Sequence, residues 1–460
     1  MLRDKTIERM LRDKTMILNV ENFGKIKHAS IDISGYSIFV GDNNSGKSYL
    51  MQLIYGVLDA FRAVHQIGEI PAFHLPTEEN PLEVNQDNFQ QFFDALNSWL
   101  DKEKNKIIKS TFNHEISIGK LWLSCEAKCP NITLKPAAKD NSKLALDKDF
   151  FNYKIYIDNI EKGGFGILKK LPSYTTEEQE VKNFLCNYLF DILMYERSYG
   201  NGLLYLPSCR SGLNLLYKDV VGEYASRASF MNIRDEDSLT PSKKLGLTKP
   251  FFDYMLFLQK YKKDDDKVSR NKTLISFIDN EILKGGHIDR ENDEIRYITE
   301  NGLNLPLHVS SSMVNEISPI IHVLTSQDRI KNILYDEIET SQHPKTQLQL
   351  ARLLNRLVNA GYRMIVSTHS DTMAAAISNL VTLSFCENNL EKAKELGYEK
   401  EDLLKKDCVH AYQFENENGE TVVKELEKFV DQGIGYDFTL FNKANERLYA
   451  DYQVIARDDA

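Results

Sequence analysis

Hydrophobic residues follow two patterns at the start of the chain. Short runs in which apolar positions alternate or cluster predict strands at 16–23, 29–34 and 36–40, with a turn at Gly24 between the first two. The next segment, 47–64, carries apolar residues at the spacing of one helix face. These residues are Leu50, Leu53, Ile54, Val57, Leu58 and Phe61. The pattern therefore predicts strands, a glycine-rich loop and a helix in succession.

The middle of the chain, from about 66 to 300, has a weaker periodicity. Residues 87–106 have an amphipathic helical pattern, and 214–300 is largely helical in pattern apart from a charged loop at 261–272. Short apolar runs predict strands at 120–127 and 152–160, and a strand that runs into a turn at 204–213. We therefore expect a mostly helical region that also contains some strands.

Alternating strands and helices return after residue 305. A serine cluster opens a helix at 310–312, and an apolar strand at 331–337 is followed by a helix and by a second buried strand at 363–370. A hairpin that turns at Asn418 and Gly419 precedes a helical tail. Because strands alternate with helices, the pattern predicts an α/β fold with parallel strands in its sheet.

Composition narrows the class of protein. Hydrophobic residues make up 42% of the 460 residues, and the net charge of −10 argues against a surface coated with basic residues for nucleic acid. No apolar run reaches the roughly 18 residues that cross a bilayer, and the N-terminus lacks the apolar core of a signal peptide. Six cysteines are few for this length. We therefore expect a cytoplasmic protein without a membrane partner.

The segment GDNNSGKS, residues 41–48, has the spacing of a phosphate-binding loop between a strand and a helix. Gly41 and Gly46 let the backbone N–H groups point at phosphate oxygens. Lys47 supplies a positive charge to the β- and γ-phosphates, and Ser48 supplies a hydroxyl ligand to Mg²⁺. The candidate nucleotide-binding residues are Gly41, Asn43, Asn44, Ser45, Gly46, Lys47, Ser48 and Tyr49.

Two acidic residues follow each other at the end of the strand at 331–337. Asp336 is placed to make the second magnesium contact through water, and Glu337 to polarise the water that attacks the γ-phosphate. By itself, an acid pair also fits the start of a helix, where it interacts with the helix dipole. The phosphate-binding loop upstream favours the catalytic interpretation. GTPases and simple kinases seldom place a glutamate directly after this aspartate.

Two further features fit a nucleotide site. His369 ends the buried strand after Asp336 and Glu337, where it would hydrogen-bond the γ-phosphate and report its loss; a lone histidine is otherwise more often structural. Ser310, Ser311 and Ser312 precede an apolar helix, which places hydroxyls and N–H groups at a positive helix end. The serines are equally open to explanation as ordinary N-capping, which needs only one of them.

The order of these motifs resembles that of an ABC-type ATPase head. The opening segment NVENFGKIKHASIDISGYSIFVGDNNSGKS is similar to the OLD-like and SMC/RecF-like branch of these ATPases, as are LYLPSCRSGL and DEIETSQHP. The motifs cover the first 60 residues and 300–370. Within this branch, a head of this length without a nuclease domain resembles the ATPase subunits of bacterial anti-phage systems. The PARIS system is the nearest, and the Septu and retron-associated ATPases are close rivals.

The resemblance implies a fold and a mode of assembly. The fold would be an ABC-type P-loop ATPase head, a mixed sheet with flanking helices and a largely helical insertion. The head would comprise 16–65 and 301–460, with 66–300 as an interaction region that contributes strands at about 115–160 and 203–213. Two copies would pair head to tail, so that ATP on one copy is clamped by the three serines of the other. His343 would then lie at the dimer seam.

The resemblance also implies a function. The chain would be a slow, regulatory ATPase that acts as a nucleotide-gated scaffold: it would hold a separate nuclease of the TOPRIM type and release it on detecting a phage protein. The alternative is a DNA-binding ATPase of the SMC, RecF or OLD type in DNA repair or chromosome maintenance; DNA is possible but not required in the first reading. A transporter motor and a metabolic kinase fit the motifs poorly.

The chain departs from the pattern of this branch at several positions. Its signature segment is SSSMV where transporter motors have LSGGQ, so which serine reaches the phosphate stays open. Gln342 stands where the branch usually has leucine. No glutamine fits the Q-loop position, and Arg210 is either a residue near that site or part of a structural salt bridge.

Overall fold

The computed structural model describes residues 15–61, 73–125, 131–136, 150–157, 160–168, 176–194, 202–229, 246–291, 294–405, 407–430 and 433–457. The chain forms two compact units. The first comprises Met1–Asn19, Leu58–Asn105 and Lys120–Gly200, and the second Val20–Val57, Lys106–Gly119 and Asn201–Ala460. Three of the boundaries fall inside one strand and two helices, and each unit combines three stretches of chain.

A nine-stranded sheet has the order β5-β1-β2-β16-β15-β3-β14-β13-β9. Strand β3 pairs in parallel with both β14 and β15, and β13 pairs in parallel with β14 and β9, whereas β15 and β16 are antiparallel. The sheet is therefore mixed, which confirms the expected α/β fold. Its strands are β1 (Met16–Phe23), β2 (Ile26–Asp32), β3 (Tyr36–Gly41), β5 (Lys120–Cys125), β9 (Leu203–Leu206), β13 (Asn332–Tyr335), β14 (Arg363–Thr368), β15 (Val409–Glu417) and β16 (Glu420–Glu425).

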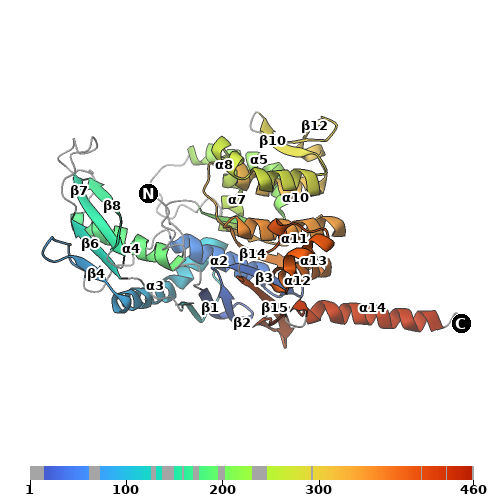
Figure 1. The fold of residues 1–460 in the computed structure, drawn as a ribbon, viewed down its shortest axis with the longest axis horizontal. Helices are drawn as coiled ribbons and strands as arrows, with labels where there is room; N and C mark the ends of the chain where they lie inside the picture. Colours follow the sequence, from blue (N-terminus) through green and yellow to red (C-terminus); the bar gives the residue numbers. More distant parts are fainter. Residues whose placement is uncertain are drawn as a thin grey trace. The chain divides into compact units, whose positions relative to one another are not determined.

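The central strands form because their residues are apolar on both faces. All six residues of β3 are buried, as are five of the six in β14, which is the pattern of a strand covered by helices on both sides. Helix α11 packs against β14 and against α12, as Figure 1 shows in orange. Along the chain, α2 (Lys47–Ala60) follows β3, α10 (Ser312–Thr325) precedes β13, α11 (Pro344–Asn359) connects β13 to β14, and α12 (Asp371–Phe385) follows β14.

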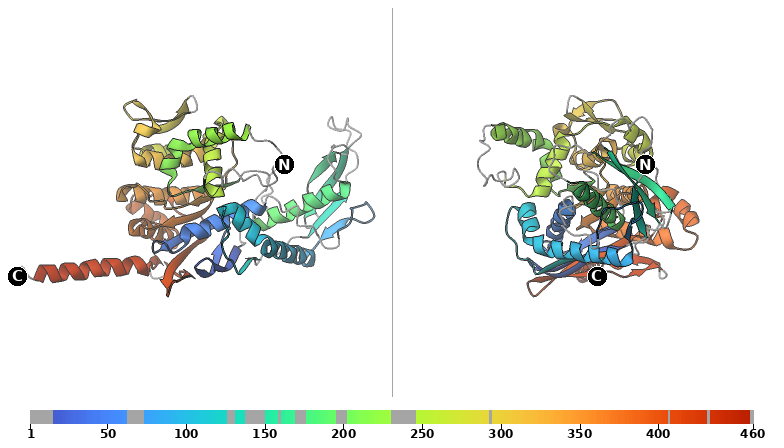
Figure 2. Two further views of the ribbon diagram at one scale, coloured as in Figure 1. Left: turned by 180° about the vertical axis from the view of Figure 1, so that it is seen from behind. Right: turned by 90° about the vertical axis from the view of Figure 1, so that its left-hand side faces the viewer.

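Most elements of the second unit agree with the elements that the sequence pattern predicts. The predicted helix at 47–64 is present as α2, which ends at Ala60; its last predicted residues lie outside the described part of the chain. The hairpin turns where predicted, because Asn418 and Gly419 both adopt positive φ angles, as a tight two-residue turn requires. The helical tail is α14 (Thr439–Arg457), which extends away from the sheet in Figures 1 and 2.

The prediction that 214–300 is largely helical is wrong at its end. Residues 287–298 form two antiparallel strands, β10 (His287–Glu291) and β11 (Glu294–Ile298), which continue into β12 (Asn304–Pro306). Ile288 and Ile295 are buried between exposed or half-buried neighbours, so the alternation of a half-buried hairpin is present in a short stretch rich in charges.

The charged stretch at 261–272 is also not only a loop. Residues Asp265–Arg270 form helix α8. The side chain of Asp264 accepts a hydrogen bond from the backbone N–H of Lys267 at 3.0 Å and so caps the helix. The other helices here are α5 (Arg210–Ser229), α7 (Lys249–Gln259), α9 (Lys272–Phe277) and the π-helix η2 (Ile278–Ile282).

The first unit contains more strand than the sequence pattern predicts. An antiparallel sheet has the order β4-β6-β7-β8, so the strand predicted at 152–160 belongs to this sheet and not to the nine-stranded one. Its strands are β4 (Leu82–Val84), β6 (Ile132–Pro136), β7 (Phe150–Ile157) and β8 (Ile160–Leu168). The first unit also contains most of the long helix α3 (Gln86–Phe112) and all of α4 (Glu177–Met194).

The remaining elements of the described chain are short: η3 (Leu307–Val309), α13 (Asn389–Glu395), η4 (Lys400–Asp402), β17 (Lys428–Phe429) and β18 (Ile434–Tyr436). Among the described helices, none is both long enough and apolar enough to span a bilayer.

Candidate nucleotide-binding site

The loop between β3 and α2 has the backbone of a phosphate-binding loop. Gly41, Asn44 and Gly46 have φ angles of 144°, 59° and 93°. A Cβ atom on Gly41 would lie 2.3 Å from the carbonyl oxygen of Phe414, so only glycine fits there. Asn43 and Asn44 are exposed, whereas Ser45 is buried. The loop is thus anchored at both ends and open in its middle.

Lys47 lies folded against this loop. Its ammonium group donates hydrogen bonds to the carbonyl oxygens of Gly41 at 2.9 Å and Asp42 at 2.8 Å, and to the hydroxyl of Ser45 at 3.2 Å. Burial lowers the pKa of Lys47 to about 8, although the carboxylates of Asp336 and Glu337 favour the charged form. The ammonium group is therefore a desolvated cation at the position where a bound phosphate would lie.

The carboxylate of Asp336, directly after β13, accepts hydrogen bonds from three hydroxyl groups. Its Oδ1 accepts hydrogen bonds from Ser48 at 3.1 Å and from Ser367 at 2.5 Å, and its Oδ2 accepts one from Tyr205 at 2.8 Å. The carboxylate is buried. The structure thus brings together Ser48 and Asp336, the two predicted magnesium ligands. A hydroxyl and a carboxylate that converge in this way are the hard oxygen donors that Mg²⁺ prefers, so the residues present fit the ion.

Glu337 and His369 lie on neighbouring strand ends. The His369 Nε2 and Glu337 Oε1 atoms are 3.8 Å apart. Burial, and then the charges of Asp336 and Glu339, raise the pKa of Glu337. Burial and the charge of Lys47 lower the pKa of His369, which favours the neutral ring. The backbone of Glu337 has a φ angle of 45°, an uncommon conformation for this residue type.

Three residues of this site are absent from the sequence prediction. Ser367 bridges the two acids, because its Oγ donates to Asp336 and accepts a hydrogen bond from the Glu337 N–H at 2.8 Å. Tyr205 reaches Asp336 from β9, and Glu339 accepts a hydrogen bond from the backbone N–H of His369 at 2.6 Å. Ser367 and Glu339 each lie two residues from a predicted site residue, which is the only sequence signal that points to them. Tyr205 has the weaker signal of lying in a predicted strand.

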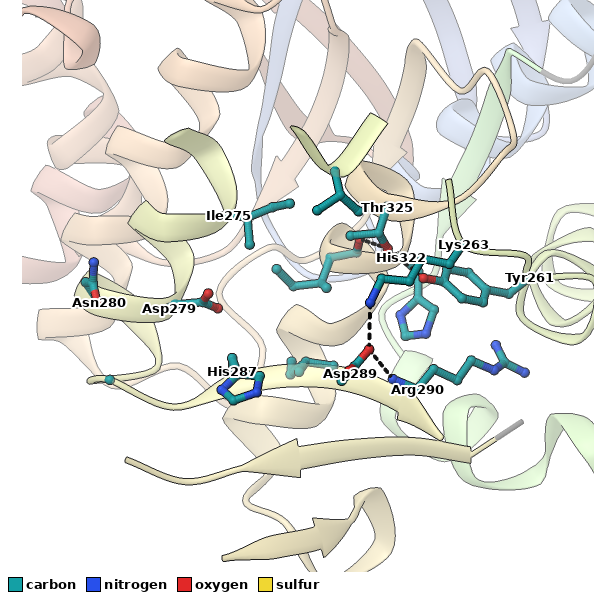
Figure 3. A pocket seen from close by; sticks show the side chains of 14 residues that line it. Tyr261, Lys263, Ile275, Asp279, Asn280, His287, Asp289, Arg290, His322 and Thr325 are labelled. Atoms are coloured by element: carbon teal, nitrogen blue, oxygen red, sulfur yellow. Dashed lines mark hydrogen bonds and ion pairs between the residues drawn. The ribbon is translucent and has the colours of Figure 1, made fainter. Parts of the chain in front are cut away.

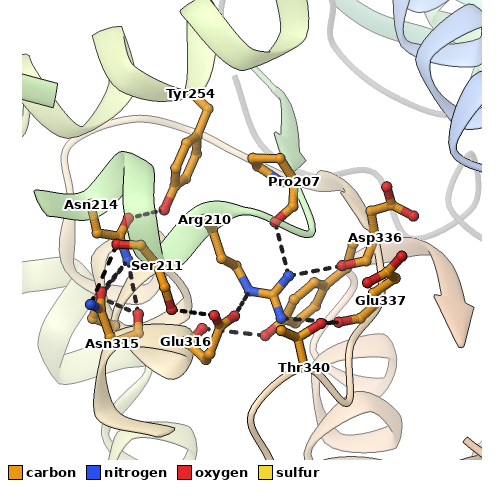
Figure 4. A network of polar contacts seen from close by, with 12 residues as sticks. Pro207, Arg210, Ser211, Asn214, Tyr254, Asn315, Glu316, Asp336, Glu337 and Thr340 are labelled. Atoms are coloured by element: carbon orange, nitrogen blue, oxygen red, sulfur yellow. Dashed lines mark hydrogen bonds and ion pairs between the residues drawn. The ribbon is translucent and has the colours of Figure 1, made fainter. Parts of the chain in front are cut away.

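Arg210 connects distant parts of the chain through a salt bridge and hydrogen bonds. Its guanidinium group pairs with the buried carboxylate of Glu316 and donates to the backbone oxygens of Asp336 at 2.8 Å and Glu337 at 3.1 Å. Figure 4 shows the guanidinium group lying between Glu316 on one side and the two acids on the other. Arg210 and Glu316 are almost fully buried, so removing one partner would leave the other charge unpaired. The geometry is that of the salt bridge considered for Arg210 from the sequence.

The serine cluster lies at the start of α10, the helix that carries Glu316. Ser311 is its N-cap, with its Oγ accepting a hydrogen bond from the Val314 N–H at 3.4 Å. Ser310 donates to the carbonyl oxygen of Pro306 at 3.1 Å. Ser311 and Ser312 are exposed. One serine thus performs the capping, and Ser312 is left with an exposed hydroxyl at the helix N-terminus.

The remaining predicted residues occupy the edges of this region. His343 is exposed and caps α11, with its Nδ1 accepting a hydrogen bond from the Lys345 N–H at 3.3 Å. Gln342 is buried, and its carbonyl oxygen accepts a hydrogen bond from the Gln347 side chain at 3.1 Å. Tyr49 is 45% exposed, and its ring lies 5.0 Å from that of Phe112.

Comparison with known proteins gives the family. A model of the AAA ATPase domain matches residues 16–194 and 254–374, which is more than half of the chain. The chain belongs to the AAA ATPase domain family. The phosphate-binding loop, Asp336, Glu337 and His369 all lie inside the matched segments. Among curated proteins, none matches this AAA ATPase significantly.

Several solved structures of SMC head domains are similar to this AAA ATPase. One is an SMC head bound to the C-terminal winged-helix domain of ScpA, with 12% identity over 91% of this chain and 99% of that chain and a TM-score of 0.37. A second, from Pyrococcus furiosus, has an extended coiled coil and is bound to the C-terminal domain of ScpA; its identity is 12%, its coverage 95% and 100%, and its TM-score 0.35. The SMC head domain from Thermotoga maritima has 12% identity, coverage of 90% and 99%, and a TM-score of 0.34.

Proposed function

We propose that this AAA ATPase binds ATP with Mg²⁺ at residues 41–48 and hydrolyses it. The observation that carries the proposal is the hydrogen bond between Ser48 and Asp336, which are 288 positions apart in the sequence. A serine directly after the loop lysine and an aspartate at a strand end meet in this way where a magnesium ion is to be held beside phosphates. The buried ammonium of Lys47 in the same loop supplies the charge that such phosphates need.

Each residue then has a chemical task. The N–H groups of the loop and Lys47 bind the phosphate chain, and Ser48 and Asp336 hold the ion, which supplies positive charge to the phosphate oxygens. Glu337 accepts the proton of the attacking water. Its raised pKa favours this task, because a general base is most effective when its pKa lies near the pH of the medium. His369, neutral at this position, donates a hydrogen bond toward the γ-phosphate.

The site is completed by a second copy of the chain. Ser312 has an exposed hydroxyl at the N-terminus of α10, a helix of 14 residues whose dipole favours an anion there. In a head-to-tail pair, the serines of one copy would close over ATP held by the other. Arg210 and Glu316 join α10 to Asp336 and Glu337 in the same chain, so closure at the serines has a rigid connection to the catalytic acids.

The biological role that we propose is a nucleotide-gated scaffold in bacterial anti-phage defence. The motifs of residues 16–60 and 300–370 support it, through their resemblance to ATPases of such systems. The scaffold would hold a separate nuclease and release it when a phage protein is detected. Co-purification with the product of the neighbouring gene tests this role. Steep, salt-sensitive binding to plain duplex DNA, without such a partner, would instead favour an ATPase of DNA repair.

Replacing Glu337 with glutamine tests the hydrolytic site. The Glu337→Gln variant should bind ATP with an affinity within about threefold of the wild type but hydrolyse it about 10²-fold or more slowly, because the water loses its base. In sedimentation velocity, ATP should convert this variant to a species of about twice the monomer mass.

The double variant Lys47→Ala/Glu337→Gln is the matched control, since it lacks the cation that holds the phosphates and should stay unchanged by ATP. Unaltered hydrolysis in Glu337→Gln would show that Glu337 is not the base. Normal ATP binding by Lys47→Ala would contradict the assignment of the loop.

A further inference from the structure

A cavity lies at the C-terminal end of α10, away from the serine cluster at the N-terminus of that helix. It has a volume of about 380 Å³ and is lined by α8, α9, η2, β10, the C-terminal half of α10 and the segment before α8. This volume lies in the range of pockets that hold small organic molecules. Figure 3 shows Asp279 directed into the cavity from η2, opposite Asp289 and His322. None of its lining residues belongs to the nucleotide site.

Asp279 has an unsatisfied acceptor in this cavity. Its Oδ1 is buried and has no hydrogen-bond partner within the part of the chain that the structure describes. Burial raises the pKa of Asp279 to about 6, and His287 opposes this effect. Near neutral pH the carboxylate is thus ionised, poorly solvated and without a strong counter-ion.

Two basic residues of the cavity, Lys263 and Arg290, have partners within the chain. Lys263 pairs with Asp289 at 3.2 Å. Arg290 donates to the carbonyl oxygen of Leu258 at 2.8 Å and to the hydroxyl of Tyr217 at 3.1 Å. Both side chains are thus held by other groups of the chain, although the Arg290 Nε has no hydrogen-bond partner among the described residues, and neither contributes to the pKa of Asp279.

The backbone at Asp279 is also unusual. The residue lies in η2, a π-helix of five residues that follows α9 without a break. Single π-turns are rare and occur frequently at functional sites, because the wider turn redirects a side chain at a cost in helix stability. Here the redirected side chain is the carboxylate that enters the cavity (Figure 3).

The cavity has apolar walls as well as the polar side chains of Asn280 and His287 beside Asp279. Ile275, Ile288 and Ile321 line the cavity from three different elements. Among the described residues there is no group of three side chains suited to bind a metal ion, which disfavours a metal as the missing cation. We propose that this cavity binds an aliphatic cation, a guanidinium or primary ammonium group on an alkyl stem, with the charged group on Asp279 and the stem along the isoleucines.

Such a group has two sources, an arginine or lysine side chain of a partner protein or a free aliphatic amine. The probes are butylguanidinium and its neutral analogue butylurea, titrated into the full chain with ¹³C-labelled isoleucine methyl groups. Butylguanidinium should shift the methyl signals of Ile275, Ile288 and Ile321 in a saturable way. Butylurea should bind about tenfold or more weakly, because it lacks the charge.

The Asp279→Asn variant keeps the shape of the side chain and should weaken butylguanidinium binding by a similar factor. Asp266→Asn is the matched control, an exposed aspartate on α8 outside the cavity, and should leave binding unchanged. Equal binding of the two probes to the wild type, or undiminished binding to Asp279→Asn, would overturn the proposal, as would the absence of methyl shifts.

Two further probes distinguish the sources. Tighter binding of N-acetyl-arginine methylamide than of agmatine would indicate a protein side chain, and the reverse order would indicate a free amine. None of these measurements uses ATP, so a failure here does not bear on the nucleotide site.

Discussion

At the scale of single residues, the site depends on hydroxyl groups that hold carboxylates in place. Asp336 is buried and accepts hydrogen bonds from Ser48, Ser367 and Tyr205. Hydrogen bonds to a charged group are each worth about 1.5–3 kcal/mol, and an ionised carboxylate inside the protein needs several of them. Ser367 is the most connected of the three donors, since it also accepts the N–H of Glu337.

Replacing Ser367 with alanine should therefore impair catalysis more than binding. Loss of the two hydrogen bonds releases both Asp336 and Glu337 from their positions. We expect kcat for ATP hydrolysis to fall by about tenfold or more, while KM for ATP changes by less than about threefold.

Ser37→Ala is the matched control in the same steady-state assay. Ser37 is a buried serine on the neighbouring strand β3, and its hydroxyl donates to the carbonyl oxygen of Asp32 at 2.6 Å, outside the site. A similar loss of kcat in both variants would show that Ser367 acts only through general stability.

At the scale of secondary-structure elements, the position of α2 sets the position of the loop and of Ser48. The helix packs closely at Gly56, where a Cβ atom would lie 2.1 Å from the Oγ1 of Thr111. Thr111 has no freedom to move, because it is fully buried and donates a hydrogen bond to the carbonyl oxygen of Ile107 at 2.7 Å. Glycine is tolerated in this helix for its lack of a side chain, despite its cost in helix propensity.

Gly56→Ala should accordingly destabilise the protein, by about 1–3 kcal/mol, since overpacking outweighs the gain in helix propensity. Gly222→Ala in α5 is the control, because nothing lies within 4 Å of its added methyl group. That substitution should be neutral or stabilise by up to about 1 kcal/mol. Urea unfolding of the two variants measures both effects, and equal stability of the pair would contradict close packing at Gly56.

At the scale of the whole molecule, one buried histidine links stability to pH. His322 lies inside α10 with its Nδ1 donating to the carbonyl oxygen of Ser318 at 2.7 Å and its ring against Tyr261. Burial lowers the pKa of His322 to about 4, with Arg290 lowering it further and Asp289 opposing. The folded state therefore requires the neutral ring, whereas the unfolded chain takes up a proton near pH 6.5.

The contribution of His322 to stability is thus complete above about pH 6.5 and is lost as the pH falls toward 4. Relative to His322→Gln, the wild type should lose about 2–3 kcal/mol of its free energy of unfolding between about pH 7.5 and about pH 4.5. Urea unfolding of both proteins across this range provides the measurement. Because its pKa is raised, Asp279 changes the free energy of unfolding with pH in the opposite direction. Both proteins contain Asp279, so its contribution cancels in the difference between them. A pH-independent difference between the two proteins would contradict a buried neutral ring.

The sequence by itself determined the local parts of this protein. The loop at 41–48, the strand that ends in Asp336 and Glu337, and the helix that opens at Ser311 follow from patterns only a few residues long, and the structure contains each of them. It also brings Ser48 and Asp336 together, as expected of parallel strands in one sheet, because their carboxyl ends meet at the same edge.

Only the tertiary structure decided which distant side chains complete these parts. Tyr205 bonds Asp336 across 131 positions and Arg210 pairs with Glu316 because helices and strands far apart in sequence pack against each other, and no local pattern records that packing. The strands at 287–291 and 294–298 were not predicted, because their alternation of apolar and polar residues is short and interrupted by charged residues. The cavity at Asp279 is likewise formed by five elements that meet only in the folded chain.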